Sequence, residues 1–412
     1  MDTAPGVSPR ERALAVAPGI SARAAAHDRD ATFPFGDFAD LHAAQLLALT
    51  VPRDHGGEGA GLADAASVLE VMGAANASTA LVLAMQYQQH ANLARNPDTP
   101  RSTTRSVFES AVRDGALINA LRVEPDLGTP ARGGLPATIA RRTADGWALS
   151  GHKQYVTGAP ALRWYTVWAR SDHDEPIVGS FLVDAAGHET GRSRGGPEGS
   201  FRGLPGGPEG GPRRSPGISI VETWDHLGMR ATGSHDVIFD NVALPADAAV
   251  AVGPPPGGGA NAADPQVMGW NGICISAVYH GVAVAARDWL VQYLHERVPA
   301  NLGAPLASLP RFQTAVGEIE TLLGASSMLM RSTAAAIDSG DRAACGAANT
   351  VKHHVTNNAI RAVDIALALV GNPGLSRKHA LERHYRDVLC SRIHTPQDDS
   401  ILLGAGRAVL KI

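Results

Sequence analysis

Apolar residues recur at helical spacing in the first and last parts of the chain. Residues 66–83 are rich in Ala, Leu and Val with few helix breakers, and residues 105–113 form a second apolar-periodic segment. Two long Ala-rich segments follow much later, at 312–338 and 342–370. Before them, one helix face is marked by apolar residues three and four positions apart: Val278, Val282, Ala285, Trp289 and Tyr293.

The middle of the chain has a different pattern. Short runs of β-branched and aromatic residues are bounded there by Gly, Asp and Pro, which is typical of strands in a small sheet. These runs lie at residues 147–151, 164–169, 181–183 and 218–221.

The order of these patterns predicts an α+β fold that is mainly α. We expect a helical domain at 11–118, a β-domain at 119–248 and a helical bundle at 265–412. Residues 187–217 contain eleven glycines and almost no large apolar side chain, so we expect a disordered insert in the β-domain. Residues 253–264 resemble a linker between sheet and bundle.

Composition narrows the possible classes. The chain has 412 residues, a formal net charge of -4 and 18% charged residues, which does not indicate nucleic-acid binding. Three distant cysteines predict neither a disulfide framework nor a cysteine-only zinc site, and we expect no metal. No apolar run approaches the ~20 residues of a membrane span, and the first residues show no signal-peptide pattern. We therefore expect a cytoplasmic enzyme.

Several glycine-rich turns carry polar or aromatic side chains. Residues 51–59 do not fit a dinucleotide-binding loop, because position 62 is Leu where that motif needs Gly. At 151–157, a strand would place Tyr155 and Thr157 on one face, with an aromatic ring beside a hydroxyl. Residues 227–234, Leu-Gly-Met-Arg-Ala-Thr-Gly-Ser, form a glycine-bounded turn before a strand.

Taken together and in order, these segments resemble the acyl-CoA dehydrogenase superfamily. Residues 227–234 match its β-domain signature most closely, and residues 151–157 resemble its G-x-K-x-W-I-T motif. The resemblance runs over about residues 12–411. It implies an N-terminal helical domain, a middle β-barrel or sandwich, a C-terminal four-helix bundle and a flavin cofactor. It also implies a homodimer or homotetramer.

The resemblance also implies which residues bind the flavin, which we expect to be FAD, or FMN if the protein is a monooxygenase. Thr129 replaces the serine of an E-P-x-x-G-S-D segment, although Pro130 stands where the family has aspartate. Arg297 is suited to the flavin pyrophosphate because its planar fork binds phosphate bidentately. The full set of implied flavin contacts is Tyr155, Thr157, Thr129, Arg297, Gln313, Gly371 and Gly374.

The catalytic base of the family is missing from its expected positions. Most members carry a glutamate nine residues after the Arg of an Arg-Asp pair, and that count from Arg386 reaches Thr395. A minority carry the glutamate on the first bundle helix, where alignment places Asn271. Neither Thr nor Asn accepts a proton near neutral pH. A positioned base contributes about 10²–10⁴-fold in rate, so its loss indicates a different base or a different reaction.

His394, one residue before the vacant position, is the candidate replacement. An imidazole with a pKa near 6.5 exchanges protons at neutral pH. Ile-His-Thr-Pro at 393–396 also resembles a Leu-His-Asp-Pro segment of flavin-dependent monooxygenases with this fold, such as dibenzothiophene monooxygenase, where the histidine assists oxygen chemistry. The alternative is that His394 only caps a buried turn.

Three hypotheses follow. The first is α,β-dehydrogenation of an acyl thioester linked to CoA or a carrier, with a non-standard base and an electron-transfer flavoprotein as partner. The second is a two-component monooxygenase that uses His394 and receives reduced flavin from a reductase. The third is a non-catalytic protein that keeps the flavin fold. The sequence favours the first slightly over the second.

Overall fold

The chain consists of three consecutive blocks: helices, then strands, then helices again. The computed structural model describes residues 6–97, 99–127, 134–186, 215–255 and 264–411. Thr129, most of the predicted insert and most of the predicted linker therefore lie outside the described residues. Within that part, the predicted α+β, mainly α fold class is confirmed, and the domain boundaries stay predictions.

Helices occupy the first block, with a short turn η1 (Arg53–His55) between the second and third. The five helices are α1 (Pro9–Asp30), α2 (Phe35–Ala43), α3 (Leu62–Ala75), α4 (Ala77–Arg95) and α5 (Arg101–Asp114).

The apolar segment at 66–83 is divided between two helices. The break is at Asn76, whose side-chain oxygen accepts a hydrogen bond from the Ser78 N–H at 3.1 Å and so caps α4. Its amide nitrogen donates to the buried carboxylate of Asp37 at 3.0 Å. Apolar composition alone concealed this break, because a capping side chain carries no apolar signal.

The middle block forms one mixed sheet, which in the described residues has eight strands in the order β6-β7-β3-β2-β4-β5-β8, with β1 paired in parallel to β4. The longest pairing is the antiparallel one between β3 and β7. The strands are β1 (Leu117–Leu121), β2 (Ile139–Arg142), β3 (Gly146–Val156), β4 (Leu162–Ser171), β5 (Val178–Asp184), β6 (Ile218–Val221), β7 (His235–Pro245) and β8 (Ala249–Gly253).

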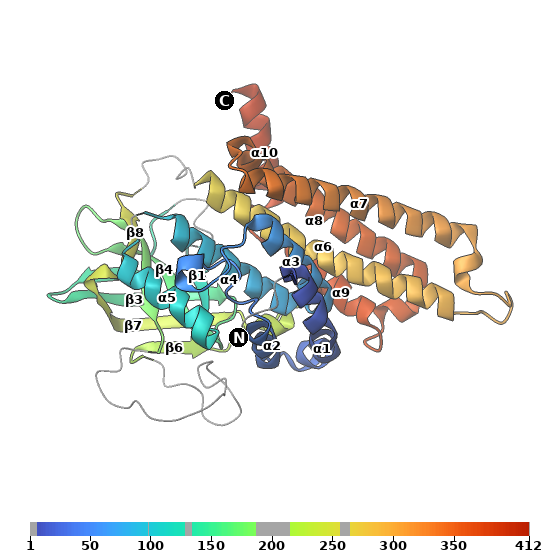
Figure 1. Cartoon of the computed structure of the whole chain (residues 1–412), viewed down its shortest axis with the longest axis horizontal. Coiled ribbons are helices and arrows are strands. Elements are labelled where there is room, and N and C mark those ends of the chain that lie inside the picture. Colours follow the sequence, from blue (N-terminus) through green and yellow to red (C-terminus); the bar gives the residue numbers. More distant parts are fainter. Residues whose placement is uncertain (1–5, 98, 128–133, 187–214, 256–263, 412) are drawn as a thin grey trace.

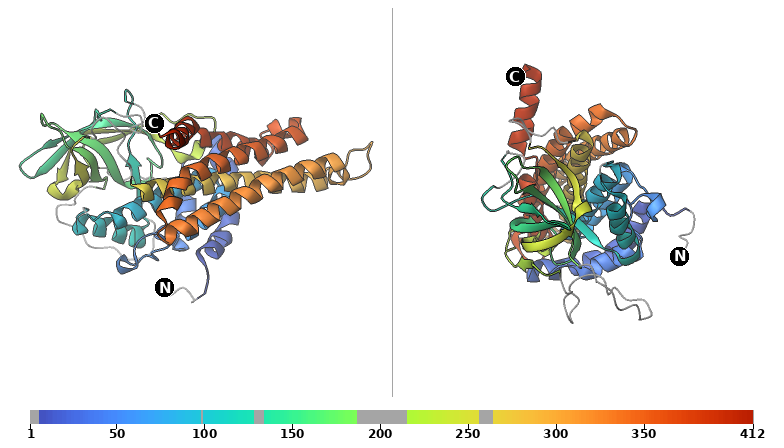
Figure 2. Two further views of the ribbon diagram at one scale, coloured as in Figure 1. Left: turned by 90° about the horizontal axis from the view of Figure 1, so that it is seen from above. Right: turned by 90° about the vertical axis from the view of Figure 1, so that its left-hand side faces the viewer.

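The last block is a bundle built around α6 (Pro265–Glu296), which packs against α3, α4, α7, α8 and α9. Figure 1 shows α6, α7 and α8 running together away from the sheet. In Figure 2 the sheet and the free end of this bundle lie at opposite ends of the molecule. The remaining helices are α7 (Pro310–Asp338), α8 (Arg342–Val370), α9 (Ala380–Leu389) and α10 (Asp398–Leu410).

The α6 helix is apolar for a structural reason. It is the one helix in the described chain that is long and apolar enough to cross a membrane by length and composition, whereas no such run was expected. However, 78% of its most apolar window is buried inside the fold. A helix surrounded by partner helices is apolar on all faces. Its composition is therefore that of a central bundle helix, and the predicted cytoplasmic location stays a prediction.

Candidate flavin site

Tyr155 and Thr157 lie where β3 gives way to a turn. The expected strand alternation between them is wrong, because Tyr155 adopts a left-handed conformation with φ 54° and β3 ends at Val156. The Thr157 N–H donates to the Tyr155 carbonyl at 3.0 Å, which closes the turn. The Tyr155 side chain is 54% exposed, so the turn presents the ring outward.

An aromatic cluster surrounds this turn. Tyr155 meets Trp224 and His226 edge-on, with ring centroids 6.4 and 5.9 Å away. Trp224 and His226 stack at 3.6 Å, and the Trp224 indole N–H donates to the Met229 carbonyl at 3.0 Å. The buried Nδ1 of His226 has no hydrogen-bond partner among the described residues, and burial lowers the pKa of this imidazole.

Hydroxyl groups line the other side of the turn. The Ser234 hydroxyl donates to the Thr157 hydroxyl oxygen at 3.2 Å and lies 2.7 Å from the Thr232 hydroxyl. The Asn119 amide on β1 donates to the Thr157 carbonyl at 2.9 Å. Thr157 is thereby fixed from two sides.

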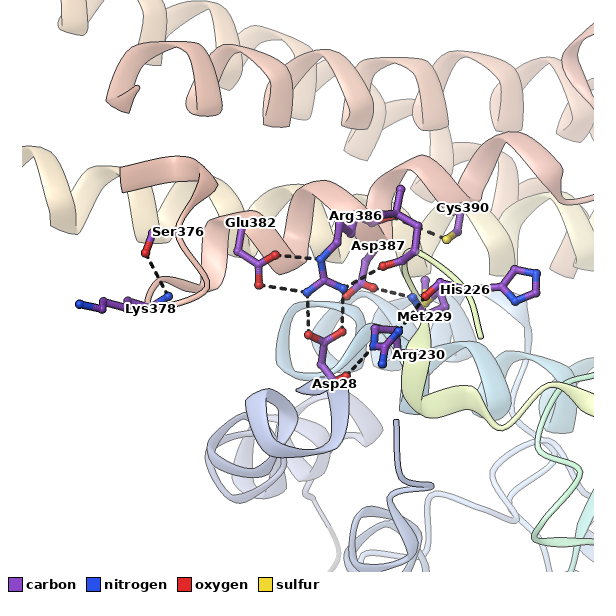
Figure 3. A network of polar contacts seen from close by, with 11 residues as sticks. Asp28, His226, Met229, Arg230, Ser376, Lys378, Glu382, Arg386, Asp387 and Cys390 are labelled. Atoms are coloured by element: carbon purple, nitrogen blue, oxygen red, sulfur yellow. Dashed lines mark hydrogen bonds and ion pairs between the residues drawn. The ribbon is translucent and has the colours of Figure 1, made fainter. Parts of the chain in front are cut away.

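The signature at 227–234 is held against α9, as Figure 3 shows. A Cβ added to Gly228 would lie 2.3 Å from the Arg386 carbonyl oxygen, so only glycine allows this approach. The next N–H, of Met229, donates to the Asp387 carboxylate at 2.7 Å. Burial raises the pKa of Asp387 to about 6, partly offset by that hydrogen bond.

Arg386 connects the same point to the N-terminal helices. Its guanidinium binds the Asp28 carboxylate at 2.6 and 2.9 Å, and also binds Glu382 and the Leu227 carbonyl. Arg230 reaches the Asp28 carbonyl at 2.8 Å. The Arg-Asp pair that marked the sequence resemblance is therefore a junction between α1, the 227–234 turn and α9 (Figure 3).

A buried ion pair joins two of the sequence motifs. The Lys153 ammonium, fully buried, binds the Glu124 carboxylate at 2.6 Å and the Trp168 carbonyl at 2.6 Å. The pKa of Lys153 is lowered to about 8 by burial, against the opposing effect of Glu124. Glu124 also accepts hydrogen bonds from Ala137 and Thr138. Both charged groups thus have hydrogen-bond partners, and the pair supports strand β3, which also carries Tyr155.

The two positions at which the resemblance expects a glutamate contact each other. The Asn271 amide on α6 donates to the Thr395 carbonyl at 2.7 Å. The Lys352 ammonium on α8 donates to the next carbonyl, that of Pro396, at 2.9 Å. Asp398, the nearest carboxylate along the chain, is bound to His353 at 3.0 Å and to Asn357 at 2.9 Å. Asn271, the Thr395–Pro396 backbone and Asp398 are therefore each engaged in hydrogen bonds within the fold.

His394 pairs with a tyrosine of α6. Its Nε2 lies 2.6 Å from the Tyr279 hydroxyl, so one proton is held between the two atoms. Burial, with a smaller contribution from the Lys352 charge, lowers the pKa of His394 to about 3. Burial also raises the pKa of Tyr279 well above its usual value. Both groups are therefore neutral near pH 7.

The other predicted flavin contacts lie at the far end of the bundle. Arg297 follows the last residue of α6 and is exposed, 26 residues beyond Asn271, which is roughly 39 Å along a helix. Gln313 in the first turn of α7 donates to the Ala307 carbonyl at 3.0 Å. Gly371, with φ 65°, ends α8, and Gly374 is buried in the following turn. Within one chain, the helices that carry these residues extend away from the sheet (Figure 1).

Sequence reasoning missed Tyr279, Lys352 and Asp28. Tyr279 stood in an apolar helical run, and the only available signal was that a buried tyrosine hydroxyl needs a partner. Lys352 and Asp28 are ordinary helix residues in the sequence, and their partners lie far away along the chain.

Comparison with known proteins places this geometry in a family. The models of the acyl-CoA dehydrogenase N-terminal and C-terminal domains match residues 14–96 and 273–398. The protein YdbM of Bacillus subtilis, whose name places it among the acyl-CoA dehydrogenases, is 33% identical and covers 92% of this chain and 90% of its own. The chain belongs to the acyl-CoA dehydrogenase family. As a member, it is a flavin-dependent oxidoreductase.

The chain also resembles proteins that are not named as dehydrogenases. L-evernosamine nitrososynthase of a Micromonospora species is 30% identical, over 90% of this chain and 82% of its own. The structure of KijD3 with FMN and a dTDP-linked amino keto sugar superposes with a TM-score of 0.75 at 27% identity, covering 99% of this chain and 95% of that one.

The residues of the turn fit a flavin. An exposed tyrosine beside stacked Trp224 and His226 offers aromatic surface to a flat ring. The unpartnered His226 Nδ1 and the Thr157 hydroxyl offer hydrogen bonds to its polar edge. The assignment of single residues to the cofactor stays a prediction.

Proposed function

We propose that this protein is a two-component, flavin-dependent monooxygenase and not an acyl-thioester dehydrogenase. The observation that carries the proposal is the hydrogen bond from Asn271 to the Thr395 carbonyl. It joins the two positions at which a family glutamate would stand, and neither residue accepts a proton. Dehydrogenation next to a thioester requires such a base, whereas oxygen transfer from a reduced flavin does not.

The nearby titratable pair suits this chemistry. When bound, the reduced flavin would supply the two electrons with which O₂ is divided between substrate and water. The low pKa of His394 rules out the free proton exchange that an ordinary imidazole would give near pH 7. His394 and Tyr279, both neutral and 2.6 Å apart, can still relay a proton between the tyrosine hydroxyl and the oxygen through the imidazole. The names of several relatives, nitrososynthases of amino sugars, favour an amine as the group that is oxygenated.

The cofactor and partners follow from this proposal. We expect FMN, delivered reduced by a separate flavin reductase, in place of the tightly held FAD and electron-transfer flavoprotein that a dehydrogenase would use. We also expect a homo-oligomer, in which a second copy supplies the Arg297, Gln313 and Gly371 end of its bundle to the turn at Tyr155. With FMN, Arg297 would bind its single phosphate in place of a pyrophosphate.

The test compares the two reactions directly. Flavin-loaded protein is mixed without oxygen with acetyl-, butyryl- and octanoyl-CoA, and the flavin absorbance should stay unchanged. The same protein with FMN, a flavin reductase, NADH, oxygen and a panel of amines and dTDP-linked amino sugars should give a product one oxygen atom heavier. Bleaching by any of the thioesters would establish the dehydrogenase, the reading that the name of YdbM favours.

The role of His394 is tested by substitution. His394→Ala should lower coupled oxygenation by about 100-fold or more, the range for a lost acid–base group, while flavin affinity is unchanged. Tyr279→Phe should shift the pH profile of the same reaction, because it removes the partner of the imidazole. Exposed His295→Ala is the control. Undiminished product formation by His394→Ala would remove His394 from the mechanism.

A further inference from the structure

One stripe of α4 is polar although most of this helix is buried. Gln88, Gln89, Asn92 and Arg95 fall within about a third of the helix circumference. Gln89, Asn92 and Arg95 are partly exposed, while Gln88 is 6% exposed. On the same helix, Leu81, Leu83 and Ala84 are buried and apolar.

Arg95 is a cation without an acidic partner. Its guanidinium lies over the buried Trp270 ring of α6, 4.8 Å from the centroid, and donates to the Asn92 side-chain oxygen at 3.1 Å. Asp264 and Asp338 act on Arg95 only through space, without an ion pair among the described residues, and the buried Nε has no acceptor there. The Arg95 guanidinium is therefore held by stacking on Trp270, and its N–H donors are not all used.

Gln88 is the second unsatisfied group of the stripe. Its amide nitrogen is buried without a partner in the described part of the chain. Gln86, two residues earlier, shows the contrast. Its amide donates to the Ala116 carbonyl at 3.0 Å, and its oxygen accepts from the Ile118 N–H at 2.8 Å. Unsatisfied buried donors are costly, so a ligand group that accepts from Gln88 would relieve that cost.

The stripe is connected through α6 to the segment that carries His394. Trp270, under the Arg95 guanidinium, directly precedes Asn271, whose amide binds the Thr395 carbonyl. Arg95 and the Thr395 segment therefore contact consecutive residues of α6. Gln88 lies about 10 Å from Arg95 along the helix axis, two turns away, and Asn92 lies between them.

We propose that Arg95, with Asn92 and Gln88, forms a subsite for an anionic group of the substrate, a carboxylate or a phosphate. Arg binds both through its planar fork. The side-chain amides of Asn92 and Gln88 would hydrogen-bond the polar part of the substrate next to its anionic group. That the bound molecule is a substrate rests on the proposed function, but the anion site itself does not depend on which reaction follows.

The first test measures anion binding to the flavin-loaded protein by calorimetry. Pyrophosphate and glutarate represent the two sources of negative charge, and glutaramide is the uncharged control. Wild type should bind at least one anion saturably and not glutaramide. Arg95→Gln should weaken that binding about 10- to 100-fold, the loss expected for a charge-assisted hydrogen bond, with flavin affinity unchanged. Arg113→Gln, also in the last turn of a helix, is the matched control and should bind normally.

The second test separates ligand binding from a structural role. Gln88→Leu should raise the midpoint of urea unfolding, because it removes an unsatisfied buried amide, and should still weaken anion binding. Gln86→Leu should lower the midpoint, because its amide is fully partnered. A Gln88→Leu variant that is less stable and binds anions normally would show that Gln88 is structural.

Three further results would overturn the inference. They are the absence of saturable anion binding by wild type, equal anion binding by Arg95→Gln, and a loss of flavin affinity in Arg95→Gln without a loss of anion affinity. Failure of the proposed reaction would appear separately, as missing oxygenation with anion binding intact.

Discussion

His90 is fully buried on α4, and neither ring nitrogen has a hydrogen-bond partner among the described residues. Burial lowers the pKa of its imidazole to about 3, and it does the same to His384 and His394. Each of these rings is therefore neutral in the folded protein at pH 5, where the unfolded chain binds a proton.

This predicts acid lability. A folded-state pKa below the unfolded value near 6.5 contributes stability above pH 6.5 that is lost as pH falls toward 3. Between pH 7 and pH 5, each buried histidine should lower the free energy of unfolding by about 2 kcal/mol. Urea unfolding at the two pH values should show a loss about 2 kcal/mol smaller for His90→Leu than for wild type. Exposed His295→Leu is the control, and an unchanged loss in His90→Leu would contradict the prediction.

Asp387 acts in the opposite direction. Its folded-state pKa of about 6 lies above the usual aspartate value, so its contribution is largest at low pH and is lost as pH rises through 6. It partly offsets the histidines between pH 6 and 4. Its position beneath the 227–234 turn places this titration at the junction of α1, α9 and the sheet.

Two glycines set the distance between α3 and α6. A Cβ on Gly281 would lie 2.2 Å from the Glu70 carbonyl oxygen, and one on Gly73 would lie 2.3 Å from the Val278 carbonyl oxygen. The backbones of the two helices therefore touch. This contact joins the N-terminal helices to the bundle and thereby fixes α6, which carries Asn271 and Tyr279.

Gly281→Ala should destabilise the protein by about 2 kcal/mol or more, because the backbone at the contact must shift to relieve overpacking. Differential scanning calorimetry measures the effect. Gly317→Ala on α7 is the matched control, since no atom lies within 4 Å of its added Cβ. That change should stabilise the protein by roughly 0.5–1 kcal/mol, the usual preference for Ala over Gly in a helix. Equal melting temperatures of the two variants would contradict the close contact.

At the scale of the whole molecule, α10 projects from the bundle (Figure 1). Leu402, Leu403, Val409 and Leu410 are 55–82% exposed. Exposed apolar surface of this kind marks an interface. The predicted flavin contacts at the far end of α6 also require a second copy to reach Tyr155, so we expect α10 to pack against another copy of this chain.

Replacing both Leu403 and Leu410 by Glu should convert the oligomer to monomers and weaken flavin binding at least tenfold. Light scattering and flavin fluorescence measure the two effects. Ser400→Glu adds a charge to exposed α10 surface outside the apolar residues and should change neither. A monomeric wild type, or an oligomer that survives the double substitution, would contradict this role for α10.

The sequence by itself determined the order of helices, sheet and bundle, because apolar periodicity and glycine-bounded strand runs are local signals. It also determined the family, through motifs such as residues 227–234, and the absence of the expected glutamate at Thr395 and Asn271. Each of these conclusions depends on residues close together in the chain.

Only the tertiary structure decided which of these residues meet. The Asn271–Thr395 and Tyr279–His394 contacts each join residues more than 110 positions apart, and Arg386 binds Asp28 across 358 positions. The left-handed turn at Tyr155 and the unpartnered amide of Gln88 also have no local signature. Hydrogen-bond satisfaction and burial depend on packing between distant segments, so the chemistry of the site follows from the folded chain.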